Sequence, residues 1–232
     1  MSEFEVHALM LSLKVSLTAV AVSLPPGIAL AWALSRLRFP GQTIVEGLVH
    51  LPLVVPPVAV GYLLLLLLGR NGILGAWLFE TFGVRVAFTW QGAAIAAAVM
   101  GFPLMVRAIR LSLDAVDAEL EDAARTLGAG RWRVFLTVTL PLTLPGIVTG
   151  CVLGFARALG EFGATITFAA NIPGETRTLP LALYTALQLP EGEAAAARLA
   201  VISIVLALAA LAVSEVLGRM AQRHRDRRRP GA

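Results

Sequence analysis

The sequence predicts an all-α integral membrane protein with five transmembrane helices, or six if one short apolar segment also crosses. Hydrophobic residues make up 57% of the 232-residue chain, charged residues make up 15%, and the mean hydropathy is +0.79. Soluble domains of ordinary composition are less apolar and carry more charge. The second observation is a series of long windows that contain no charged residue.

Four of these windows are long enough to cross the roughly 30 Å of membrane hydrocarbon as helices. They have 21 or 23 residues each and lie at 15–35, 47–69, 86–106 and 134–156. A fifth window, 199–214, has only 16 residues, and it spans if Arg198 and Glu215 lie at the two interfaces. Residues 178–189 are charge-free but too short to span, so we expect an interfacial or partly re-entrant segment there.

The sequence also bears on processing, disulfide bonds and partners. Glu3 and Glu5 precede the first apolar run without a basic cluster, which does not fit a cleaved signal peptide. The single cysteine, Cys151, lies in a predicted span, so no disulfide framework exists. The net charge is +4, but the basic residues lie beside the spans and in a tail at about 219–232, without interleaved aromatics. We therefore expect the lipid bilayer as surroundings and no nucleic acid partner.

The distribution of basic residues predicts the orientation. With five spans the termini lie on opposite sides, and the loop ends on the C-terminal side carry 13 of the 19 basic residues. The other side carries Arg70, Arg85, Arg177 and Arg198. The positive-inside rule therefore places the N-terminus outside and the C-terminus in the cytoplasm.

A polar, helix-forming segment at about 112–133 separates the third and fourth spans on the predicted cytoplasmic side. Gly128 stands where a helix C-cap glycine is expected. The residues at helical spacing that form one small, smooth face are Ala118, Leu120, Ala123, Ala124 and Leu127. Such a helix at the water side of a membrane protein predicts a contact for a soluble partner.

The same segment resembles the EAA motif of binding-protein-dependent ABC importer permeases. That motif is Glu-Ala-Ala, three residues, Gly, nine residues and Ile-x-Leu-Pro. Here the sequence has Asp122-Ala123-Ala124, Gly128 and Val138-Thr139-Leu140-Pro141, with Asp for Glu, Val for Ile and the spacing intact. The resemblance implies a type I ABC importer permease fold; an ordinary loop helix is the alternative. The residues that it implies for coupling to an ATPase are Asp122, Ala123, Ala124, Gly128, Leu140 and Pro141.

The chain has no ATP-binding or catalytic motif of its own. Its only lysine, Lys14, follows Leu13, which rules out a GxxxxGK[ST] phosphate-binding loop. The three histidines are scattered and give no metal-ligand or nucleophile–base spacing. We therefore expect no enzyme activity, metal or cofactor in this chain, and an energy source in another subunit.

Residues 51–75 and 157–193 resemble the permease subunits of molybdate ABC importers. The related sulfate permeases share parts of the second segment but are typically longer. The resemblance implies one permease domain over 1–232 in a bacterial inner membrane, acting as a homodimer. It also implies a cytoplasmic ATPase dimer that binds ATP and Mg, and an external binding protein that delivers molybdate or tungstate. A permease for another oxyanion such as sulfate, and a non-transport membrane scaffold or enzyme, are the alternatives.

Prolines and glycines interrupt the predicted spans. A single proline is ordinarily a kink, but Pro56 and Pro57 in mid-span, followed by Gly61, favour a helix that lines a pathway. After the fourth span the chain either continues as a long tilted helix or breaks near Gly160 or Gly163.

One acidic residue, Glu161, lies in this last region. A carboxylate in the membrane costs at least ~2.5 kcal/mol unless it is paired or hydrated, so we expect Glu161 to pair with Arg157 or to cap a broken helix. A carboxylate also repels an oxyanion. The hydroxyls of Thr165 and Thr167 and the backbone near Gly163 are therefore the better candidates for weak substrate contacts.

Overall fold

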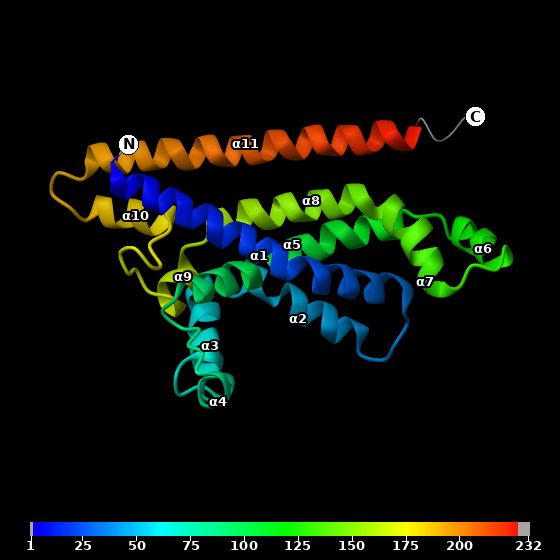
Figure 1. The fold of residues 1–232 in the computed structure, drawn as a ribbon, viewed down its shortest axis with the longest axis horizontal. Helices are drawn as coiled ribbons and strands as arrows, with labels where there is room; N and C mark the ends of the chain where they lie inside the picture. Colours follow the sequence, from blue (N-terminus) through cyan, green and yellow to red (C-terminus); the bar gives the residue numbers. More distant parts are fainter. Residues whose placement is uncertain (1, 227–232) are drawn as a thin grey trace.

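Four long apolar helices lie along the long axis of the molecule (Figure 1). The structure is a computed structural model that describes residues 2–226. Among these residues, four helices are long and apolar enough to cross a membrane, and one bent pair can supply a fifth span, in agreement with the five predicted. The four long helices are α1 (Glu3–Arg36), α5 (Trp90–Asp114), α8 (Leu140–Leu159) and α11 (Glu193–Asp226).

The fourth span is longer than α8 alone. It begins with α7 (Arg131–Val134) and continues through a π-helical turn, η1 (Phe135–Thr139), directly into α8. Residues 131–159 thus form one membrane-spanning unit. The part of the predicted basic tail at 227–232 lies outside the described residues.

The predicted second span, 47–69, is present only as two helices. These are α2 (Gln42–Val54) and α3 (Pro57–Leu68), which meet at an angle of 117°. Pro56 and Pro57 have no N–H to donate, and a residue that precedes a proline is disfavoured in the helical conformation. Val55 is accordingly extended, with φ −71° and ψ 137°, and the helix direction changes there.

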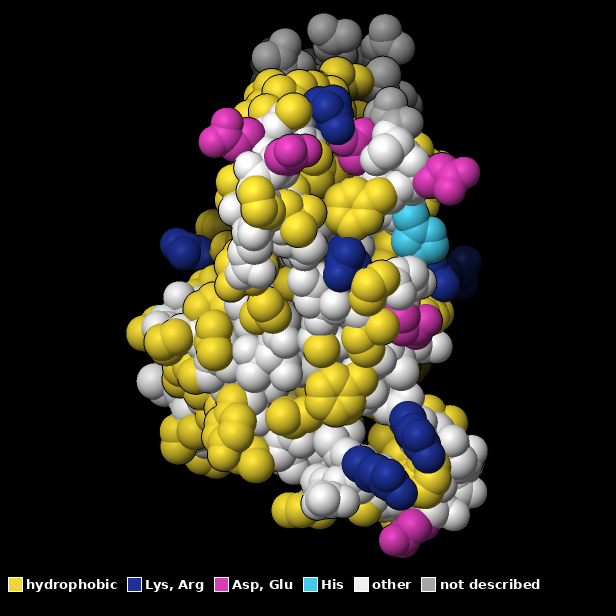
Figure 2. All heavy atoms as spheres, turned by 90° about the vertical axis from the view of Figure 1, so that its left-hand side faces the viewer, with side chains coloured by type: hydrophobic (Ala, Val, Ile, Leu, Met, Phe, Trp, Pro, Cys, Tyr) yellow, Lys and Arg dark blue, Asp and Glu magenta, His cyan; other side chains and the backbone are white. Residues whose placement is uncertain are grey.

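The second half of this bent pair leaves the bundle sideways. After α3 the chain turns into α4 (Ile73–Phe82), and together they form the arm at the bottom of Figure 1 and the lobe at the bottom of Figure 2. The guanidinium groups of Arg70 and Arg85 lie 5.9 and 4.9 Å from the ring centre of Phe79 in this arm.

The core is built on α5, which packs between α1 and α8 through small residues. Ala93, Ala94 and Ala97 of α5 are buried against Val15 of α1 and Ala158 of α8. A Cβ placed on Gly101 would lie 3.1 Å from the carbonyl oxygen of Gly154. Because neither residue has a side chain, the backbones of α5 and α8 approach closely there.

Two short helices and the start of α1 make up one end of the molecule. They are α9 (Gly163–Phe168) and α10 (Leu179–Leu187), and α10 corresponds to the predicted interfacial segment. Leu179 and Ala182 of α10 are buried against Ala8 of α1 and Leu199 of α11. The opposite end carries α6 (Ala118–Thr126) (Figure 1).

Candidate functional site

The helix predicted to contact a partner is α6. Its first turn is capped by the side chain of Asp117. At its end Gly128 has a φ of +83°, and its N–H donates to the carbonyl of Arg125 at 2.9 Å. The N–H of Ala129 donates to the carbonyl of Ala124 at 3.1 Å. This pair of bonds around a left-handed glycine is the usual way to end a helix, as expected for Gly128.

The small apolar face of α6 is open to solvent. Leu120 and Leu127 are 49% and 88% exposed, Ala123 is exposed and Ala124 is half-buried. A Cβ placed on Gly128 would meet no atom of the described residues within 4 Å. Residues 2–226 therefore leave this surface uncovered.

Leu140 and Pro141, the other two coupling candidates, do not lie on α6. They begin α8, on the far side of η1. Leu140 packs against the core cluster that contains Ile109 and Leu113 of α5. The candidates thus form an exposed group on α6 and a second group at the start of α8.

Glu121, which the sequence analysis did not select, holds α6 in place. Its carboxylate is only 8% exposed and lies 3.0 Å from the Nη2 of Arg36. The hydroxyl of Thr139 donates to the same carboxylate at 2.8 Å. The neighbouring Asp122 is instead exposed, and it pairs with Arg125 at 2.7 Å on the helix surface. Glu121 therefore connects α6 to both the end of α1 and the end of η1.

At the other end of the bundle, α3 and α9 touch through glycines. A Cβ placed on Gly61 would lie 2.6 Å from the carbonyl oxygen of Ala164 and 2.9 Å from the Cβ of Thr167. A Cβ on Gly163 would lie 2.8 Å from the Cβ of Pro57. Pathway candidates about 100 residues apart in sequence thus meet at one helix contact.

Glu161 lies in the break between α8 and α9. Its side chain is 1% exposed, and one carboxylate oxygen is 2.6 Å from the Nη1 of Arg157. The other oxygen accepts the N–H of Ala164, in the first turn of α9, at 2.8 Å. Both structural roles considered for Glu161, an ion pair and a helix cap, are present together.

Neither of the two pathway threonines is exposed. Thr165 is buried, and the hydroxyl of Thr167 donates to the carbonyl of Gly163 at 2.9 Å. Gly160 ends α8 and Pro56 precedes α3, and both are exposed. In this conformation Gly160 and Pro56 are more exposed than either threonine.

The sequence pattern of the family described as "Binding-protein-dependent transport system inner membrane component" matches residues 23–223. The chain belongs to this family. One relative, the molybdenum transport system permease protein ModB of Escherichia coli (strain K12), is 62% identical over 223 residues, which cover 96% of this chain and 97% of that protein. The sulfate transport system permease protein CysT of the same strain is 39% identical over 197 residues, 85% of this chain and 71% of that protein.

A solved structure has the same fold. It is a bacterial ABC transporter involved in the import of the acidic polysaccharide alginate, and the match has a TM-score of 0.73. The two chains are 19% identical, and the match covers 95% of this chain and 80% of the other. As a family member, this chain is a multi-pass membrane component of a transport system, with the permease fold of an ABC importer, and not an enzyme.

Proposed function

We propose that this chain is the membrane-spanning subunit of an importer for molybdate or tungstate, driven by ATP hydrolysis in a separate subunit. The observation that carries the substrate class is the 62% identity, over 96% of this chain, to a molybdenum transport permease. The relative named for sulfate transport shares 39%. We therefore assign this chain the substrate class of the more similar relative, and sulfate remains the second candidate.

The proposed assembly is a homodimer with a cytoplasmic ATPase dimer on one face and a molybdate-binding protein on the other. The exposed face of α6 supports the ATPase contact, because Ala123, Ala124 and Gly128 leave room for close approach by another protein. ATP and Mg are bound by that partner. The excess of arginines at the α6 end supports a cytoplasmic location for it in the bacterial inner membrane, with the N-terminus outside.

A continuous chain of contacts supports coupling between α6 and the α3–α9 contact. Glu121 holds α6 to η1 through Thr139, and η1 continues into α8. At its far end α8 carries Arg157, which holds Glu161 and hence the first turn of α9. We propose that a displacement of α6 by the ATPase is passed through η1 and α8 to the break at Gly160.

The proposed route for the oxyanion passes this break. Free backbone N–H groups and hydroxyls attract an oxyanion without binding it tightly, as passage requires. Gly163 and the two threonines are the candidate sources of such groups at the point where α9 meets α3, whereas the N–H of Gly160 is already donated to the carbonyl of Ala156. Glu161 has a structural role there, because its carboxylate already pairs with Arg157 and accepts an N–H of α9.

Transport in a defined system tests the proposal. The chain would be reconstituted in liposomes with its ATPase and its binding protein, and uptake of labelled molybdate, tungstate and sulfate would be compared. We expect ATP-dependent uptake of the first two and little of the third. Equal or preferred uptake of sulfate would assign the chain to the sulfate class, and titration of the binding protein alone would show whether selectivity lies there.

A further inference from the structure

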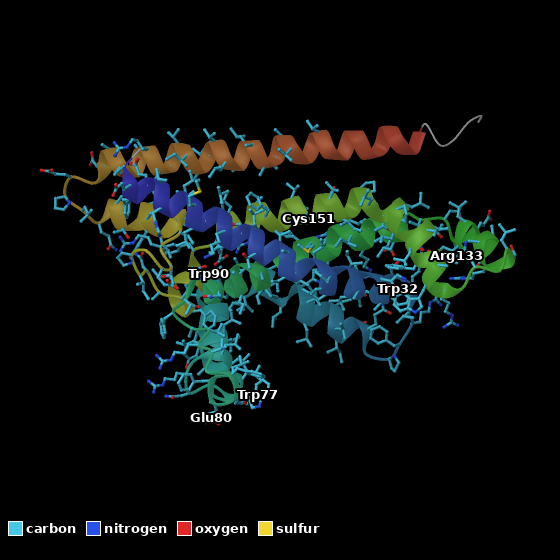
Figure 3. The ribbon with its side chains drawn as sticks, viewed as in Figure 1. Trp32, Trp77, Glu80, Trp90, Arg133 and Cys151 are labelled. Carbon is cyan, nitrogen blue, oxygen red and sulfur yellow. The ribbon has the colours of Figure 1, made fainter. Side chains whose placement is uncertain are left out.

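Two adjoining clefts lie where α1 ends beside α6 and α7. One has a volume of about 730 Å³ and the other about 640 Å³. Trp32, Arg131 and Phe135 line both, so the two clefts share a wall. Figure 3 shows Trp32 near the α6–α7 end of the bundle.

The first cleft is basic. Arg36, Arg125 and Arg131 line it together with two acids, Glu121 and Asp122, so it holds one more positive than negative side chain. Arg36 uses its Nη2 for Glu121, while its buried Nε has no hydrogen-bond partner among the described residues. Arg131 forms no ion pair with any described residue. Since Arg36 and Arg125 are paired with the two acids, the exposed Arg131 is the cation of this cleft that is left for an anion.

The second cleft is apolar and runs along α1. Apart from Arg131, its lining consists of apolar residues, among them Pro25, Ile28 and Ala29. From Arg36 back to Pro25 is eleven residues, or about 16 Å of helix. That length is about half of the roughly 30 Å hydrocarbon thickness. The cleft therefore extends from the membrane surface toward the bilayer centre.

We infer that the paired clefts bind one anionic phospholipid of the cytoplasmic leaflet. The phosphate lies at Arg131 and Arg36, and an acyl chain lies along Pro25 and Ala29. Trp32 lines both halves and Trp132 lines the apolar one, and aromatic residues of this kind are enriched at membrane interfaces. A soluble protein does not fit the apolar half, because that half lies at the depth of the hydrocarbon. The leaflet assignment rests on the orientation given in the proposed function.

A lipid in this position touches the parts that hold α6. Arg36 also binds Glu121, and Phe135 is the first residue of η1 and packs edge-to-face on Trp32 at 6.3 Å between ring centres. The headgroup therefore stabilises the junction from which α6 projects. Basic clefts at the cytoplasmic ends of membrane helices are established sites for anionic headgroups.

Native mass spectrometry of the purified permease with its ATPase tests this site. Delipidated protein would be mixed with micelles of phosphatidylglycerol or phosphatidylcholine, and retained lipid would be counted. We expect preferential retention of phosphatidylglycerol, which millimolar inorganic phosphate does not displace. Arg131→Gln should lower retention about fivefold, the effect of one basic residue near an anionic surface. Ala29→Phe should reduce it further by filling the apolar half.

Two variants serve as matched controls. Arg133→Gln removes the same charge two residues away, and Ala21→Phe adds the same bulk to α1, yet neither residue lines either cleft. Retention must stay at the wild-type level in both. Equal retention of the two lipids, equal losses in the controls, or displacement of the lipid by the ATPase would overturn the inference. The lipid count involves no oxyanion, so a wrong substrate assignment would appear in the uptake assay and leave this result unchanged.

Discussion

Arg36 and Glu121 lie 3.0 Å apart and join the last turn of α1 to α6. The pair is largely enclosed, and Thr139 completes the hydrogen bonds of the carboxylate from η1. Three segments that are distant in sequence are thereby fixed to one side chain. The exposed face of α6 is presented to a partner from this fixed point.

Replacing Glu121 by Gln should loosen this junction. The change leaves Arg36 without its charge partner, and a hydrogen bond to a charged group is worth about 1.5–3 kcal/mol. We expect a lower unfolding temperature of the purified permease and reduced co-purification of the ATPase. Glu119→Gln is the control, since an exposed substitution on the same helix should change stability by less than about 0.5 kcal/mol. Similar effects of the two variants would show that Glu121 has no special role.

Gly128→Trp should release the ATPase while the permease still inserts and folds. A Cβ at this position meets no described atom of this chain within 4 Å, so apart from the strain of the positive φ we expect the added bulk to act on a docked partner. Gly128→Asn controls for the positive φ, which Asn tolerates better than most residues. Co-purification and oxyanion uptake would be measured for both, together with Ala124→Arg. Normal coupling in the Trp and Arg variants would rule out this face as the docking surface.

Gly61→Ala should damage the α3–α9 contact. The new methyl group would lie 2.6 Å from the backbone oxygen of Ala164, which cannot move away as a side chain can. Overpacking of this kind costs about 1–3 kcal/mol. Assembled protein, measured by size-exclusion chromatography, should fall. Gly47→Ala in α2 meets no described atom within 4 Å and should behave as wild type, so equal yields of the two would contradict the close contact.

Glu161→Gln should lower the yield of assembled protein more than it changes the preference between oxyanions. The amide leaves Arg157 unpaired at a half-buried position and weakens the cap of α9. Yield and uptake per assembled molecule would be measured separately. Full assembly with complete loss of transport would instead place the carboxylate in the gate.

Thr165→Val, at normal expression, should reduce the transport rate if its hydroxyl contacts the substrate.

The orientation can be tested with single cysteines. Residues 2 and 232 would be replaced one at a time in a Cys151→Ser background, and labelled with a membrane-impermeant maleimide. We expect Ser2→Cys to react from outside and Ala232→Cys only after the membrane is opened. Labelling of both from one face would mean that the number of spans is even.

Hydropathy and local chemistry were sufficient to predict much of this structure. The spans follow from charge-free windows, Gly128 ends its helix with the expected positive φ, and Glu161 pairs with Arg157 one turn away. Each of these features depends on residues that are close together in the sequence. The contact of Gly61 with Ala164 joins parts of the chain that local sequence patterns do not connect.

The role of Glu121 was missed for the same reason. Four acidic residues occur between 117 and 122, and sequence alone does not show which of them is buried. The choice depends on Arg36, 85 residues earlier, and on Thr139, 18 residues later. The bend at Val55 was signalled by the two prolines, but its angle depends on where α3 finds a surface to pack on, which is α9.

Gly61 has no side chain of its own where it faces the backbone of Ala164 and the Cβ of Thr167, and this limits how the protein can change shape. Side chains at a helix contact can usually adopt new rotamers and let two helices slide, but backbone atoms in direct contact have no such adjustment. α3 and α9 must therefore travel together as one body or part altogether. We therefore expect a cycle that opens a path between them to separate the two helices in one step and not by gradual widening.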